Sequence, residues 1–102
     1  MKKIINDKLY NSETATRLYH YDNKLYTTDI NYYSEALYKT KKGSYFLLKE
    51  GGAMSKMSKT NGISKTGDMD IEAFSPEEAQ DYLIEHQAID VFEIEFGFLD
   101  EA

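Results

Sequence analysis

Residues Ser75 to Glu78 form a helix start signal, and this signal divides the chain into two parts of different character. Ser75 is a favoured N-cap residue, Pro76 suits the first helical position, and Glu78 completes a capping box with Ser75. The next residues place apolar or aromatic side chains at i, i+3, i+4 and i+7, the spacing of one buried helix face. That stripe consists of Ala79, Tyr82, Leu83 and His86.

Before Ser75, short runs of β-favouring residues alternate with turn residues. The clearest pair lies around Tyr33 and Leu37 and over residues 45–49, and the segment KKGS between them suits a hairpin turn. We expect this hairpin at the centre of a sheet. Residues 69–74 alternate apolar and acidic side chains, which predicts a strand with one apolar face. That face consists of Met69, Ile71 and Ala73, and further strands are expected over residues 2–5, 8–10 and 16–21.

Two segments are less regular. Residues 51–67 are rich in Gly, Ser and Lys, which predicts a loop with one short helix over residues 53–58. After the first helix, Gln87 and Ala88 indicate a break. Residues 89–96 fit both helical spacing and strand alternation, and we favour a helix that ends at Gly97.

These patterns predict an α+β fold in which an antiparallel sheet of about four to five strands carries one or two C-terminal helices on one face. The length of 102 residues suits a single domain. Residues 1–74 are expected to be mainly β, with the loop at 51–67, and residues 75–97 to form an acidic helical segment.

Composition removes several classes of function. The chain contains no cysteine, which excludes disulfides and thiolate chemistry. No apolar run approaches the roughly 20 residues of a membrane span, and polar residues interrupt the basic start MKKII at once, unlike a signal peptide. We therefore expect a cytoplasmic protein without a membrane partner.

The net charge of −6 conceals a strong asymmetry. Residues 1–65 contain all 12 lysines and arginines with 6 acidic residues, whereas residues 66–102 contain 12 acidic residues and no lysine or arginine. Carboxylates without a local basic partner project a negative field outward. Such a surface attracts a basic groove of the kind that holds a nucleic-acid backbone.

The predicted interaction surface is centred on the helix that begins at Pro76. Glu77, Asp81 and Glu85 lie four residues apart, so they recur about every 6 Å along one helix face. Like charges at this spacing destabilise an isolated helix. We predict that these residues and Glu78 form the centre of a partner-binding surface, although an acidic face that serves solubility alone is the alternative. The predicted rim consists of Asp68, Asp70, Glu72, Glu93 and Glu95.

The sequence offers no convincing catalytic arrangement. His20 and His86 are its only histidines, and His86 falls on the apolar stripe of the helix, where a core histidine is the ordinary interpretation. The chain has no glycine-rich phosphate motif, and the segment DMDIE lacks the later residues of a calcium loop. We expect a protein that is not an enzyme and that holds no cofactor and no metal. An unrecognised active site around one histidine is the alternative.

A second alternative comes from the basic part of the chain. Eight tyrosines accompany lysines in residues 1–65, and aromatic rings beside lysines on a sheet can stack bases and hold phosphates. This pattern would suit a small nucleic-acid-binding protein, although the overall negative charge opposes direct nucleic-acid binding. An exposed tyrosine-rich sheet could also support a homodimer.

The ordered segments IINDKLYNSETATRL, YYSEALYKTKKGSYFLLKEGGAMSK, FSPEEAQDYL and FEIEFG resemble a family of small proteins from low-GC Gram-positive bacteria and their phages. Members show an IYNGKxYDTxTA start, an LYxTxxGx[FWY]FL hairpin, an EGGAxSK segment and an acidic EEA helix. The departures here lie in turns, where Asn6-Asp7 replaces Asn-Gly and Asn11-Ser12 replaces Asp-Thr. The family is similar to anti-CRISPR proteins. The resemblance implies an inhibitor in the bacterial host cell that binds a CRISPR–Cas effector or another DNA-handling defence protein and blocks its nucleic-acid-binding surface.

Overall fold

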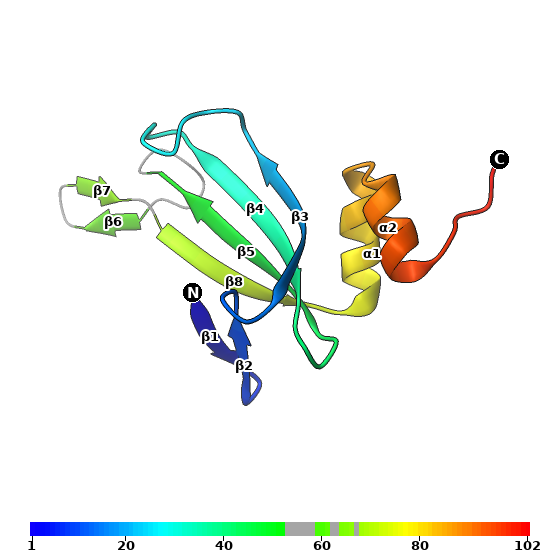
Figure 1. Ribbon diagram of the computed structural model, residues 1–102. Helices are drawn as coiled ribbons and strands as arrows, with labels where there is room; N and C mark the ends of the chain where they lie inside the picture. Colours follow the sequence, from blue (N-terminus) through cyan, green and yellow to red (C-terminus); the bar gives the residue numbers. More distant parts are fainter. Residues whose placement is uncertain (53–58, 62–63, 67) are drawn as a thin grey trace.

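A four-stranded antiparallel sheet forms the centre of the molecule, with the strand order β3-β4-β5-β8. The computed structural model describes residues 1–52, 59–61, 64–66 and 68–102 (Figure 1). The strands of this sheet are β3 (Thr16–Asp22), β4 (Tyr33–Lys39), β5 (Tyr45–Gly51) and β8 (Asp68–Phe74). Two small hairpins, β1 (Lys2–Ile5) with β2 (Lys8–Asn11) and β6 (Lys59–Asn61) with β7 (Ser64–Thr66), and two helices, α1 (Pro76–Glu85) and α2 (Ile89–Phe96), complete the α+β fold.

The hairpin β4–β5 occupies the sheet centre, as predicted from the β-favouring runs on either side of KKGS. Its register pairs Leu37 with Leu47 and Lys39 with Tyr45. In the turn, Gly43 adopts a φ of 90°, a conformation that a residue with a Cβ atom rarely adopts. The turn is closed by a backbone hydrogen bond from the Thr40 amide to the Ser44 carbonyl at 2.8 Å, and the Ser44 amide donates to Thr40 Oγ1 at 3.0 Å.

The sheet is covered on both faces, because side chains alternate between faces along each strand. On one face, Leu37, Tyr45 and Leu47 pack against the two helices, which contribute residues such as Leu83 and Phe92. On the other face, Phe46 and Ile71 form a second apolar cluster with the N-terminal hairpin, which contributes Tyr10 of β2 and Ile5 of β1. The prediction of helices on one face is therefore confirmed, and the hairpin β1–β2 covers the opposite face.

Helix α1 begins as the sequence predicts. The Ser75 hydroxyl accepts a hydrogen bond from the Glu78 amide at 3.1 Å, and the Glu78 carboxylate accepts one from the Ser75 amide at 2.9 Å. Ala79, Tyr82 and Leu83 are buried, which confirms most of the predicted stripe. The chain turns at Gln87, whose φ is 56°, and this is the predicted break between the helices.

Residues 89–96 form a helix rather than a strand, which confirms the favoured interpretation. Gly97 is its C-cap residue, with a φ of 98° and a ψ of 174°, so the positive φ is observed without the expected left-handed helical ψ. The helices stand at one end of the sheet and the hairpin β6–β7 projects at the other (Figure 1). The Cα radius of gyration is 15.2 Å, above the roughly 13 Å typical of a compact chain of this length.

Two details differ from the predictions. The segment 51–67 is not all loop, because β5 extends to Gly51 and residues 59–61 and 64–66 pair as β6 and β7. The short helix predicted over residues 53–58 lies outside the described residues. The predicted apolar face of β8 is buried only in part: Ile71 is 1% exposed, whereas Met69 is 39% exposed.

Candidate protein interface

The outer face of α1 carries an unpaired row of carboxylates. Glu77, Asp81 and Glu85 are exposed and lie at successive four-residue steps on the helix. In the part of the chain that the structure describes, no basic side chain forms an ion pair with any of these three carboxylates. We call this row, Glu77, Asp81 and Glu85, the acidic face of α1. The row contains three of the four residues that the sequence predicts for the centre of the interaction surface.

Glu78 stabilises the N-terminus of α1, as the capping-box motif in the sequence predicts. Its side chain completes the capping box by accepting from the Ser75 amide. The side chain is thereby held at the N-terminus of α1, where a negative charge is also favourable because of the helix dipole. Glu78 therefore belongs to the helix cap rather than to the acidic face.

Two of the predicted rim residues are neutralised by lysines from the basic part of the chain. Lys3 of β1 contacts Asp70 of β8 at 2.7 Å, and Lys49 of β5 contacts Glu72 at 3.1 Å. The hydrogen bond from Lys3 lowers the pKa of Asp70 below its ordinary value. Asp70 and Glu72, two of the predicted rim residues, thus each have a lysine partner, in contrast to the acidic face of α1.

Glu95 of α2 is also paired. Its carboxylate accepts a hydrogen bond from Lys39 at 2.6 Å and another from the Tyr45 hydroxyl at 2.6 Å. Burial alone would raise the pKa of Glu95, but the hydrogen bonds from Lys39 and Tyr45 outweigh it and lower the pKa overall. Only 11% of the Glu95 side chain is exposed, so this carboxylate anchors α2 to the sheet.

The remaining two predicted residues lie apart from the acidic face of α1 along the chain. Asp68 begins β8 opposite Gly51, at the end of the strand that is far from α1. Glu93 lies within α2 and is half-buried. Of the nine predicted carboxylates, the structure therefore aligns three on one exposed helix face, and the others cap the helix, form ion pairs or belong to other elements.

Sequence analysis missed the apolar residues beside the acidic face. Ile84 follows Asp81 by three residues, which places it on the same side of α1, and it is 47% exposed. Ile89 and Leu99 are 55% and 48% exposed and lie with Ile84 around a pocket of about 190 Å³. The signal was present in the sequence, because Ile84 is an apolar residue outside the predicted stripe. An exposed apolar centre beside charged residues is typical of a protein interface.

A second missed feature is the environment of Glu35 in β4. Its carboxylate accepts hydrogen bonds from the hydroxyls of Tyr33 and Tyr82, the latter at 2.9 Å. Burial, followed by these hydrogen bonds, raises the pKa of both phenols above their ordinary value. Both phenols are therefore protonated at neutral pH. The bond from Tyr82 joins α1 to β4, whereas the bond from Tyr33 lies within β4.

His86 lies beside this group as part of an aromatic cluster. Its ring centroid is 4.2 Å from that of Tyr82 and 5.2 Å from that of Tyr21. An open pocket of about 420 Å³ is lined by His86, Glu35 and Tyr21 among others. His86 and the Glu35 carboxylate thus line the same open pocket. The hydrogen bonds of Glu35 tie it to tyrosines that are held protonated, which favours a structural role for the group.

The tyrosines of the basic part are mostly packed inside the fold. Of the eight tyrosines in residues 1–65, two are half-buried and four are buried, namely Tyr10, Tyr32, Tyr33 and Tyr45. Tyr21 and Tyr26 are exposed, at 39% and 87%. Because a stacking platform needs several exposed ring faces side by side, these positions do not supply one.

The described residues contain no group of three or more histidine, aspartate or glutamate side chains arranged to hold a metal ion. Neither helix in the described part of the chain has the length and apolar character that a membrane crossing requires. Comparison of the chain with known protein families, with curated proteins and with solved structures found no match in any of the three.

Proposed function

We propose that the protein is a stoichiometric inhibitor that binds a basic, nucleic-acid-binding surface of another protein through the acidic face of α1. The observation that carries this proposal is the exposure of Glu77, Asp81 and Glu85 in a row without an ion pair among the described residues. A partner evolved to bind phosphates every few ångströms offers lysines and arginines that such a row can engage.

The position of Glu85 adds weight to this proposal. Glu85 is the last residue of α1, and no basic residue occupies the last turn. A negative charge at a helix C-terminus opposes the helix dipole and costs about 0.3–1 kcal/mol. Residues that lower the stability of the fold and form no stabilising contact are typical of binding sites.

The apolar pocket beside the acidic face adds an apolar component to the proposed interface. Ile84, Ile89 and Leu99 are exposed around it, so binding would bury apolar area as well as pair charges. Such an interface excludes water from the centre while the carboxylates speed association and set the orientation. By the family resemblance, the first partners to test are CRISPR–Cas effectors, followed by other DNA-handling defence proteins.

The proposal is tested by capture and by inhibition. Tagged protein is incubated with a lysate of a CRISPR-bearing bacterium, and each recovered nuclease is assayed for DNA cleavage with and without the protein. We expect inhibition to saturate near one inhibitor per effector and to weaken as the salt concentration rises, because screening reduces charge attraction. Cleavage that stays unchanged at a large molar excess of the protein over every recovered nuclease would refute the proposal.

A pair of charge-matched variants locates the binding face. The variant Asp81→Lys/Glu85→Lys reverses two charges of the acidic face, whereas Glu13→Lys/Glu101→Lys reverses two exposed acids elsewhere in the chain. Both variants carry the same net charge. We expect the first to lose at least about a hundredfold in affinity, since opposed charges cost several kcal/mol, and the second to stay within about threefold. Equal losses in the two variants would assign the effect to net charge rather than to α1.

A further inference from the structure

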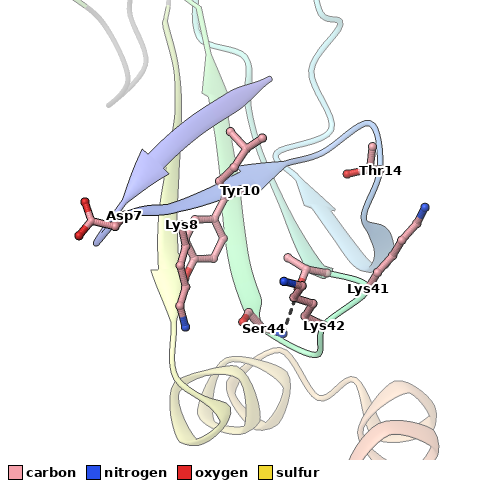
Figure 2. Close-up of a pocket in the computed structure, with 9 residues that line it drawn as sticks. Asp7, Lys8, Tyr10, Thr14, Lys41, Lys42 and Ser44 are labelled. Carbon is pink, nitrogen blue, oxygen red and sulfur yellow. Dashed lines mark hydrogen bonds between the residues drawn. The ribbon is translucent and has the colours of Figure 1, made fainter.

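Three lysines line a pocket between the N-terminal hairpin and the β4–β5 turn (Figure 2). Lys8 of β2 lines one part of it, and Lys41 and Lys42 of the turn line another. All three side chains are exposed, and none forms an ion pair among the described residues. By contrast, Lys3 and Lys39 are each paired with a carboxylate. The pocket therefore gathers positive charge that no carboxylate of the described segments pairs with.

Hydroxyl groups and a rigid turn complete the pocket. Thr14, Thr40 and Ser44 line it together with the lysines. The Ser44 amide donates to Thr40 Oγ1 at 3.0 Å, and the Gly43 amide donates to the Thr40 carbonyl at 2.9 Å, so the lysine-bearing turn has a fixed backbone. Tyr10, which is buried against Phe46, lies at the base of the pocket.

The one acidic residue of the lining does not occupy the pocket. Asp7 lies at the β1–β2 turn, and Figure 2 shows its carboxylate directed away from Lys42 and Ser44. Three lysines against one aspartate leave a positive lining. The cavity volume of about 520 Å³ falls within the range of ordinary small-molecule sites.

We propose that this pocket binds the phosphate group of a small phosphorylated ligand of about nucleotide size. Lysine ammonium groups supply charge-assisted hydrogen bonds to phosphate oxygens, and serine and threonine hydroxyls supply neutral ones. The remaining volume accommodates the organic part of the ligand above Tyr10. The proposal is independent of the acidic face of α1, because it rests on different elements and on the opposite charge.

Nuclear magnetic resonance titration of the full chain tests this site. The probes are inorganic phosphate, adenosine 5′-monophosphate, adenosine and a short single-stranded oligonucleotide. We expect shifts of the amide signals of residues 40–44 and of residues 8–10 with the phosphate-bearing probes and none with adenosine. Tighter binding of the monophosphate than of inorganic phosphate supports a small nucleotide ligand, whereas binding of the oligonucleotide alone would overturn the small-ligand proposal and indicate a nucleic-acid backbone. If none of the phosphate-bearing probes shifts these signals at millimolar concentration, the proposal is wrong.

Matched variants separate the pocket from general charge. Lys8→Gln/Lys42→Gln removes two positive charges from the pocket, and Lys2→Gln/Lys24→Gln removes two from exposed lysines that do not line it. We expect the pocket variant to raise the dissociation constant of the best probe at least about tenfold, the effect of losing one good charged contact. The control should change it less than about twofold. Equal effects would show that the probe responds only to overall charge.

Discussion

Lys39 of β4 and Glu95 of α2 meet at 2.6 Å, and this contact joins the second helix to the sheet. Tyr45, which lies opposite Lys39 in the register, donates to the same carboxylate. The contact also explains why a residue that the charge pattern assigns to an interaction surface is unavailable for one. Basic and acidic parts of the sequence thus partly neutralise each other in the fold.

The Lys39–Glu95 pair predicts a pH-dependent stability. The pKa of Glu95 is lowered in the folded protein, so its contribution is complete above the ordinary glutamate value of about 4.3 and is lost as the pH falls through the folded pKa. Lys39→Met should lower the free energy of unfolding by about 1–2 kcal/mol at pH 7. In urea titrations the difference from the parent protein should shrink as the pH is lowered below about 4. Lys39→Arg is the control and should retain most of the stability; a pH-independent difference would contradict the assignment.

Tyr82 predicts the opposite pH dependence. Burial and the hydrogen bond to Glu35 raise its pKa, so its contribution is present below the ordinary tyrosine value of about 10 and is lost as the pH rises further. Tyr82→Phe should cost about 1 kcal/mol at neutral pH because Glu35 loses one donor. Thermal denaturation across alkaline pH should show a weaker loss of stability in this variant than in the parent. Tyr26→Phe, at a position that is 87% exposed, should leave both quantities unchanged.

Variants of the capping box test whether Glu78 stabilises the helix rather than binds a partner. Ser75→Ala should lower stability by about 1 kcal/mol, since it removes the acceptor for the Glu78 amide. Glu78→Gln keeps a side-chain oxygen for the Ser75 amide and should cost little. Circular dichroism melting measures both effects. If Glu78→Gln left the fold intact but abolished partner binding, Glu78 would also contact the partner, and its assignment to the helix cap alone would be wrong.

Glu85→Lys should raise the stability of the fold and weaken partner binding. Lysine at this last helical position complements the helix dipole and removes the repulsion from Asp81, so the free energy of unfolding should rise by about 0.5–1 kcal/mol. The same change should weaken partner binding. Denaturant titration and a binding assay on one preparation measure both quantities. Lower stability in Glu85→Lys would show that Glu85 has a structural partner and would count against a binding role.

Gly52 and Gly43 should differ in their tolerance of alanine. A Cβ atom at Gly52 would lie 2.7 Å from the backbone carbonyl oxygens of Asp29 and Ile30, so the loop before β4 would have to move. We expect Gly52→Ala to cost about 1–3 kcal/mol. At Gly43 nothing lies within 4 Å of the added atom, and the cost should be the backbone strain of a positive φ, about 1 kcal/mol. Urea midpoints would rank the two, and an equal or smaller loss at Gly52 would contradict the clash.

Local signals in the sequence predicted the elements well because those elements depend on neighbouring residues. The cap at Ser75 and Pro76 located α1, and the turn around Gly43 located the central hairpin. The helix over residues 89–96 was ambiguous locally, because Phe92 fits both patterns. The helix directs Ile94 to solvent, where it is 87% exposed, although strand alternation would place it on the same face as Phe92.

The ion pairs of the predicted rim residues could not be predicted from the sequence, because they depend on contacts between distant segments. Asp70 is neutralised by Lys3 only because the hairpin β1–β2 folds back on β8, and nothing near Asp70 in the sequence indicates that contact. The hydrogen bond from Tyr82 to Glu35 likewise requires the packing of α1 on β4. The acidic face of α1 was predictable because its spacing is set within one helix.

Strand β3 lies at the edge of the sheet, and within the described residues it pairs only with β4. Its register shifts between Arg17 and Tyr19. An irregular edge of this kind twists away from a straight neighbour and offers it few aligned amide and carbonyl groups. The shift should therefore discourage edge-to-edge aggregation from this side of the sheet, so that among the described strands β8 is the edge left open to a further strand.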